Sequence, residues 1–310
     1  MSSYTLLKDE QSRTATADGH HLSKSVCELV LLRSGSNGPP LFLLPGGGGG
    51  KPTDFSIFAQ HIRYDHAIYA IRLEDLERDI AAPQKRIEHL AQFCLKVIEE
   101  RQPSGPYFFL GHSLGGLILM EAAHELSERR EEIAMLGFLD SYPNPRHWPF
   151  RCWLEMLVRR CRHHARSLTK LPIREALVRA VRLGRGFMDH FRVRRGVRPH
   201  KWREPGVAHL APIESPDEAL GNWAHYRPRY YDNKIMFFKA EIPTDTPSDP
   251  LWVWRKFAKS IEILVVPGNH VDMLTTHARE LADSISRCLD HARIAHMDRS
   301  SWAHRSSTQR

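Results

Sequence analysis

The chain has 310 residues, of which 42% are apolar and 26% charged, a composition typical of a globular protein with a sizeable core. Its 44 lysines and arginines exceed its 36 acidic residues, so the formal net charge is +8. No stretch approaches the roughly 18 apolar residues of a membrane-spanning helix, and the N-terminus lacks the apolar run of a signal peptide. Its 5 cysteines are scattered and form no CxxC pair, which favours reduced thiols and a cytoplasmic location.

Short apolar runs recur along the chain, and amphipathic segments separate most of them. Apolar residues occupy nearly every position of each run, as in parallel strands that are buried on both faces. This alternation predicts an α/β fold with a mainly parallel central sheet. The predicted strands are 27–32, 41–46, 67–73, 107–113, 135–141, 235–241 and 261–268, and the predicted helices are 86–102, 114–130, 151–165, 172–183 and 278–292.

The alternation is interrupted at 142–225, where no run resembles a strand. Two amphipathic helical patterns in this segment predict a helical lid inserted between two strands of the sheet. The pattern therefore predicts an N-terminal extension at 1–26 and a main domain at 27–292 that contains this lid. The last residues, 293–310, are polar and low in apolar content, so they are expected to form a disordered tail.

The hexapeptide GHSLGG, at 111–116, lies where a predicted strand becomes a helix. In this context G-x-S-x-G is typical of a nucleophile elbow, a sharp turn that holds the serine in a strained conformation above the sheet. Gly111 and Gly115 leave room for the turn, and the hydroxyl of Ser113 is exposed at the positive end of the following helix. The alternative is a Gly/Ser turn that merely joins strand to helix, and the flanking strand and helix favour the nucleophile.

A serine hydroxyl needs a base, and the base needs an orienting carboxylate. His270 lies in a loop after the last predicted strand and is the candidate base. Asp140 ends a strand and is favoured as the acid, because a carboxylate at the end of an apolar strand is costly unless it has a partner. Glu241 ends the next strand and remains the alternative acid, with Asp245 just beyond it. Asp272 is too near the candidate base in sequence to be the default choice.

The other histidines are expected to have different roles. His112 adjoins the nucleophile and is expected to point away from it, as a packing or hydrogen-bonding residue. The pairs His20/His21 and His163/His164 have no cysteine or acid at ligand spacing, so no metal site is predicted.

An oxyanion hole needs two backbone N–H groups. Leu114, which follows the nucleophile, supplies one, and the glycine run after an early strand supplies the other through Gly46 or Gly47. A phosphate-binding P-loop, G-x-x-x-x-G-K-[ST], is the rival interpretation of this run. Pro45 and Pro52 stand where that motif requires glycine and serine or threonine, so the P-loop is rejected.

The segment QPSGPYFFLGHSLGGLILMEAAHEL, at 102–126, resembles the thioesterase domains that end nonribosomal peptide and polyketide synthetases. In that family Gly-Pro-Tyr precedes the elbow strand and Glu-x-Ala leads the following helix. The similarity extends to PPLFLLPGGGG, MLGFLDSYP, YRPRYYDNKIMFFKAE, a tryptophan and VVPGNHVDML, and so to nearly the whole sheet. The resemblance implies an α/β-hydrolase fold with Ser113 as nucleophile, Asp140 as acid, His270 as base and an oxyanion donor at Gly46 or Gly47.

The resemblance also implies the substrate, an acyl or peptidyl thioester on a phosphopantetheine arm. Ser113 would form an acyl-enzyme, from which water releases an acid or an internal nucleophile releases a ring. The implied partner is a carrier protein or synthetase module, and no metal or redox cofactor is required. Leu114 and Gly116 stand where editing thioesterases more often have Met and Ala, so the chain looks more like the chain-releasing type.

Arginines and lysines crowd the lid between Arg146 and Arg203, where acids are few. A basic lid would steer an acidic carrier and the phosphate of its arm toward the site. A solvated helical face, a nucleic acid and an anionic membrane surface are the alternatives. No nucleic-acid motif accompanies the lid aromatics, and neither nucleic-acid binding nor stable membrane insertion is expected.

Two other functions remain open. A carboxylesterase or lipase acting on free oxygen esters shares the elbow and the triad, because both reactions are acyl transfers. A non-catalytic binding module on the same scaffold is less favoured, since every required residue type is present and in order.

Overall fold

The computed structural model describes residues 27–46, 55–73, 87–168, 175, 226–243 and 246–307, with side chains at 163–168 and 300–307 left undescribed. The predicted N-terminal extension, Gly47, Asp245 and the predicted helix at 172–183 lie outside the described residues, apart from position 175.

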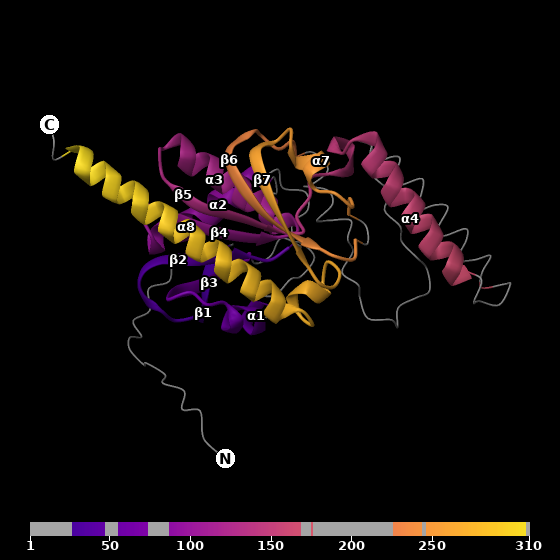
Figure 1. The fold of residues 1–310 in the computed structure, drawn as a ribbon, viewed down its shortest axis with the longest axis horizontal. Coiled ribbons are helices and arrows are strands. Elements are labelled where there is room, and N and C mark those ends of the chain that lie inside the picture. Colours follow the sequence, from indigo (N-terminus) through magenta and orange to yellow (C-terminus); the bar gives the residue numbers. More distant parts are fainter. Residues whose placement is uncertain are drawn as a thin grey trace, which may run out of the picture.

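A sheet of seven strands lies at the centre of the described part of the chain, in the order β1-β3-β2-β4-β5-β6-β7 (Figure 1). β1 pairs antiparallel with β3, and the other neighbouring strands are parallel. All the strands predicted from apolar runs are confirmed. They are β1 (Cys27–Arg33), β2 (Ser36–Leu44), β3 (His66–Leu73), β4 (Tyr107–His112), β5 (Ile133–Leu139), β6 (Tyr231–Ala240) and β7 (Ala258–Val266).

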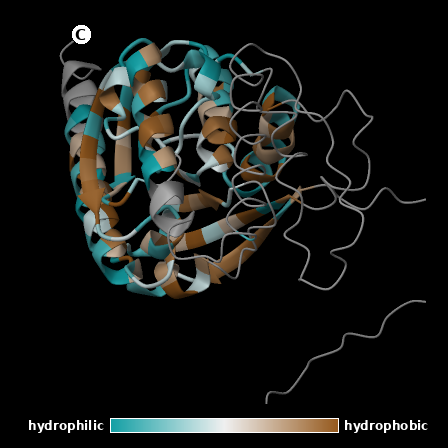
Figure 2. Cartoon of the chain, turned by 90° about the vertical axis from the view of Figure 1, so that its right-hand side faces the viewer, coloured by the Kyte–Doolittle hydropathy of each residue, from teal (hydrophilic) through white to brown (hydrophobic). Residues whose placement is uncertain are grey.

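Helices cover both faces of the sheet, as continuous apolar strands require. On one face, α2 (Ile87–Arg101) and α3 (Leu114–Glu128) bury their apolar sides together with α7 (Leu251–Trp254). On the other face lie α1 (Ser56–His61) and α8 (Ala278–Ser307), which crosses the sheet in Figure 1. The strands between these layers are mostly coloured as hydrophobic in Figure 2. This arrangement confirms the predicted α/β fold.

The predicted stripe of α2 is buried as expected. Residues spaced three or four apart fall on one side of a helix, and that side faces the sheet. The buried residues are Ile87, Leu90, Ala91, Cys94, Leu95 and Ile98.

The first helix of the predicted lid is present as α4 (Phe150–Leu168), which follows the short helix η3 (Pro145–His147) and projects away from the sheet (Figure 1). Its first turns are anchored to the core, because Trp153, Met156 and Leu157 are almost fully buried.

The predicted disordered tail is wrong for residues 293–307, which continue helix α8 to Ser307. This segment contains neither glycine nor proline, so a low apolar content does not end the helix. Polar contacts anchor it to the domain instead. Arg293 lies 3.2 Å from Asp65, His296 lies 2.9 Å from Glu132, and Arg299 pairs with the same glutamate.

Two further findings concern the described residues as a whole. None of their helices is both long enough and apolar enough to cross a membrane. The cysteines are free thiols, of which Cys161 is exposed and the others are buried.

Candidate active site

The register of the sheet brings the candidate residues to one edge. Leu44 of β2 is level with Gly111 of β4, and His112 of β4 is level with Leu139 of β5. Ser113 and Asp140 follow these positions directly, and Gly46 follows Leu44 after one proline. Ligands of parallel α/β sheets bind at the carboxyl ends of the strands, which is where these residues lie.

The turn between β4 and α3 has the strained geometry predicted for the elbow. Ser113 has φ 53° and ψ −121°, in the left-handed half of backbone space that residues with a Cβ avoid. Its backbone N–H donates to the Leu139 carbonyl at 3.0 Å. A Cβ atom at Gly111 would lie 2.4 Å from the Gly116 nitrogen, and one at Gly115 would lie 2.3 Å from the Leu44 carbonyl oxygen. The glycines of the motif are therefore required by the tight turn.

The structure joins His270 to Asp140. His270 Nδ1 lies 2.8 Å from Asp140 Oδ2, and the side chains are 26% and 1% exposed respectively. Asp140 Oδ1 is buried and has no hydrogen-bond partner among the described residues. The His270 imidazole is therefore the side chain that holds this buried carboxylate.

The alternative acids do not make this contact in the described part of the chain. Glu241 is exposed, and its backbone N–H donates to the Val266 carbonyl at 2.8 Å. Asp140 is placed differently, because its backbone N–H donates to the Phe238 carbonyl at 2.9 Å and its side chain is buried. The choice of Asp140 over Glu241 as the partner of His270 agrees with this geometry.

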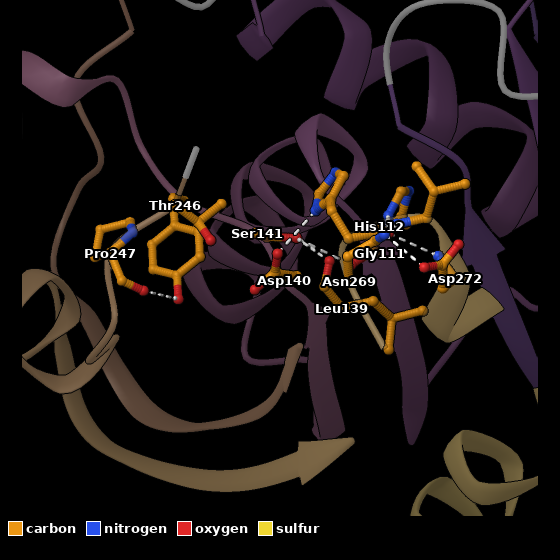
Figure 3. Close-up of polar contacts among 12 residues, drawn as sticks. Gly111, His112, Leu139, Asp140, Ser141, Thr246, Pro247, Asn269 and Asp272 are labelled. Carbon is orange, nitrogen blue, oxygen red and sulfur yellow. Dashed lines mark hydrogen bonds and ion pairs between the residues drawn. The ribbon is translucent and has the colours of Figure 1, made fainter. Parts of the chain in front are cut away.

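The loop that carries His270 is organised by Asn269, a residue whose role the sequence analysis missed (Figure 3). Asn269 Oδ1 accepts hydrogen bonds from the backbone N–H groups of Val271 at 2.9 Å and Asp272 at 3.0 Å. Its Nδ2 donates to the Asp272 carboxylate. The Gly-Asn-His sequence after a strand is a signal for such a turn, and Gly268 adopts a φ of 86° that favours glycine.

His112 packs and forms a hydrogen bond, as predicted. Its Nε2 lies 3.0 Å from the His270 carbonyl oxygen, and the two imidazole rings are 4.5 Å apart at an angle of 33°. Phe55 presents an edge to the same ring at 6.4 Å. Burial, followed by the proximity of His270, lowers the pKa of His112 from 6.5 to about 3, so this imidazole is neutral.

The backbone of Gly46 passes directly against the serine. A Cβ atom at Gly46 would lie 2.8 Å from Ser113 Cβ, so no side chain fits there. Leu114 begins α3, whose first backbone N–H groups have no partner within the helix. Both predicted donor segments thus adjoin the serine.

One predicted contact is not formed. No hydrogen bond links Ser113 Oγ to His270 Nε2 within the described residues. Ser113 follows His112 in the sequence, and the backbone of His270 contacts the His112 ring. Catalytic hydrogen bonds are often long in a free enzyme and tighten when substrate binds.

No group of three or more His, Cys, Asp or Glu has the arrangement of a metal site in the ranges that the structure describes.

The central sheet is mostly parallel, with a strained serine turn after β4, a buried aspartate directly after β5 and a histidine loop after β7. This arrangement is that of the α/β-hydrolase fold. Residues 39–289 match the family model of the thioesterase domain. The chain therefore belongs to the thioesterase domain family, which confirms the resemblance seen in the sequence.

The sequence relatives are synthetases of the expected kind. The chain is 33% identical over 123 residues to a dimodular nonribosomal peptide synthase of Bacillus subtilis (strain 168), covering 39% of this chain and 5% of the relative. It is 34% identical over 118 residues to enterobactin synthase component F of Escherichia coli (strain K12), covering 37% and 9%. The matched region thus makes up less than a tenth of either synthetase.

Solved structures share the fold. The thioesterase domain of NocB, from the nocardicin cluster, has a TM-score of 0.54 at 17% identity, over 86% of this chain and all of that one. A four-domain nonribosomal peptide synthetase has a TM-score of 0.52 at 19% identity, over 85% of this chain and 20% of that one. Both likenesses confirm the α/β-hydrolase fold.

Proposed function

We propose that this thioesterase domain releases an acyl or peptidyl chain from a phosphopantetheine-bound thioester through an acyl-Ser113 intermediate. The contact of 2.8 Å between His270 Nδ1 and buried Asp140, beside a strained serine turn, carries the proposal. Membership of the thioesterase domain family and the kinship with peptide synthetases support the thioester substrate.

The proposed reaction begins when Ser113 Oγ attacks the thioester carbonyl and His270 Nε2 takes the hydroxyl proton. Asp140 Oδ2 accepts the hydrogen bond from Nδ1–H, which fixes the tautomer and stabilises the imidazolium. The backbone N–H of Leu114 and one from Gly46 or Gly47 hold the oxyanion. The C–S bond then breaks, and the thiol leaves with the proton from His270.

The acyl-enzyme is resolved by the same groups. His270 takes a proton from water, which attacks the ester carbonyl and releases an acid. An internal amine or hydroxyl of the acyl chain can replace water, and the product is then a ring. In both cases His270 returns the proton to Ser113 Oγ as the ester bond breaks.

Substitution of the serine tests the covalent mechanism. Ser113→Ala is expected to lower kcat on a pantetheine thioester by about 10⁴-fold, as for removal of a triad nucleophile. Ser127→Ala is the matched control, because Ser127 lies on the same helix and its hydroxyl donates to the Ala123 carbonyl at 2.7 Å. A Ser113→Ala variant that keeps a rate within tenfold of the parent would contradict the mechanism and favour a binding module.

The acid is tested by comparing two substitutions. Asp140→Ala is expected to lower kcat by about 10⁴-fold, and Glu241→Ala to leave it within twofold. A loss confined to the Glu241 variant would reverse the assignment.

The substrate class is tested by the leaving group. The ratio of kcat/KM for a pantetheine thioester to that for a p-nitrophenyl ester of the same acyl chain is expected to exceed one. A strong preference for the oxygen ester would instead favour the carboxylesterase alternative.

The proposed partner is a carrier protein or synthetase module that approaches over the basic lid. The described lid helix α4 carries arginines at 151, 159, 160 and 162 against one acid, Glu155, between residues 150 and 162. Arg162→Glu is expected to lower kcat/KM on a carrier-bound thioester, more so at low salt, and to spare a free pantetheine thioester. Lys259→Glu, a charge reversal on β7 outside the predicted lid, is the control. An equal loss on both substrates would argue against steering.

A further inference from the structure

We infer that His112 is a positioning residue that links the loop carrying His270 to the loop carrying Gly46, so that base and oxyanion donor are both held beside the turn that carries Ser113. The inference rests on the proposed function, in which His270 is the base. It assigns a task to the histidine of GHSLGG, which the proposed mechanism leaves unused.

The first of the two contacts is a hydrogen bond between His112 and the backbone of the base. His112 Nε2 lies 3.0 Å from the backbone carbonyl oxygen of His270. The side chain of that same residue contacts Asp140 at 2.8 Å. His270 is therefore held at two points, its backbone by His112 and its ring by Asp140. The two imidazole rings also pack against each other at 4.5 Å and 33°, which restricts movement of the base.

The second contact is the packing of His112 against the loop that carries Gly46. A Cβ atom at Gly46 would lie 3.2 Å from His112 Nδ1 and 3.3 Å from the His112 carbonyl oxygen. The backbone of this loop therefore rests on the edge of the imidazole that faces away from the hydrogen bond. Phe55 presents its ring edge to the same imidazole, at 6.4 Å and 70°. The ring is thus enclosed by the loop of His270 and by two early segments of the chain, at Gly46 and Phe55.

The chemistry of this position favours a neutral donor. A carbonyl oxygen only accepts hydrogen bonds, so His112 Nε2 carries the hydrogen and Nδ1 is unprotonated. Burial keeps the ring uncharged. A cation at 4.5 Å would oppose proton uptake by His270, whereas a neutral imidazole provides the hydrogen bond without that repulsion. Gln is the neutral side chain whose terminal N–H best reproduces the reach of Nε2, while the amide of Asn is too short.

The test compares His112→Gln with His112→Asn. Asn is expected to lower kcat on a pantetheine thioester by about 10- to 100-fold, because a small misplacement of a catalytic group has effects of this size. KM should stay within twofold, and Gln should recover kcat to within about threefold of the parent. His124→Asn is the matched control, because His124 is a buried histidine of α3 that packs edge-on against Tyr231. It should leave kcat within twofold.

The outcomes separate the inference from the proposed function. Equal losses in the Gln and Asn variants would show that His112 acts only by its shape, and an unchanged kcat in both would show that it positions nothing. Either result overturns the inference. Ser113→Ala is measured in parallel. If it stays active, the proposed function fails; if it is inactive while His112→Asn has the parent kcat, only the positioning role fails. Should His112→Asn not fold, His112→Ser replaces it, since Ser also cannot reach the His270 carbonyl.

Discussion

The neutral state of His112 makes the stability of the fold depend on pH, and His112→Gln should remove that dependence. In the unfolded chain a histidine has its ordinary pKa of 6.5, whereas burial lowers the pKa of folded His112 to about 3. Between these values the unfolded chain binds a proton at this residue and the folded chain does not. Stability is therefore lost as the pH falls from about 6.5 toward 3.

The size of the effect follows from the shift. Well inside this window, each unit of pH decrease lowers the free energy of unfolding by roughly 1.4 kcal/mol. The effect becomes small as the pH rises through the pKa of the unfolded chain. Between pH 7 and pH 5 the free energy of unfolding should fall by about 2 kcal/mol from this residue alone. The Gln variant lacks the titration and should lose about 2 kcal/mol less over the same interval.

Urea unfolding of both proteins at pH 7 and pH 5 measures this difference. Other histidines with lowered pKa, such as His147 and His124, contribute equally to both proteins and cancel. His270, the titratable group in contact with His112, is likewise present in both. If the two proteins lose the same free energy between these pH values, His112 is not held neutral in the fold and the reasoning fails.

Two other substitutions follow from close contacts. Gly46→Ala should lower kcat by about tenfold or more. The Cβ atom of the alanine would lie 2.8 Å from Ser113 Cβ and would displace the loop or the serine. An unchanged kcat would argue against this packing. Glu121→Ala should lower the free energy of unfolding by about 2–4 kcal/mol, because it removes the partner of the buried Tyr226 hydroxyl at 2.7 Å and of Arg229 at 3.0 Å. A loss below about 0.5 kcal/mol in urea unfolding would contradict the role of that buried pair.

Much of the fold could be predicted because its signals are local. A parallel strand buried on both faces is apolar throughout, so the runs that contain Phe109 and Phe237 reveal strands without any knowledge of their neighbours. Asp140 could be favoured over Glu241 because a carboxylate at the end of such a run requires a partner. The end of α8 could not be predicted, since ion pairs with Glu132, more than 150 residues away, anchor it.

The candidate site was predictable in its residue types and less so in its contacts. The elbow motif identifies Ser113, and position after the last strand identifies His270. The hydrogen bond from His112 to the His270 carbonyl joins residues 158 positions apart, and no local pattern encodes it. The sequence at Asn269 indicates a turn locally, but it does not indicate that this turn places His270 at the site.

The most direct test of the account is the intact mass of the enzyme after brief exposure to a panel of carrier-bound acyl thioesters. We expect a gain equal to one acyl group, located by peptide mapping to Ser113, absent from Ser113→Ala and slowed in His270→Ala and Asp140→Ala. Turnover without any covalent adduct at Ser113, or an adduct that forms equally well in the His270 variant, would contradict the account.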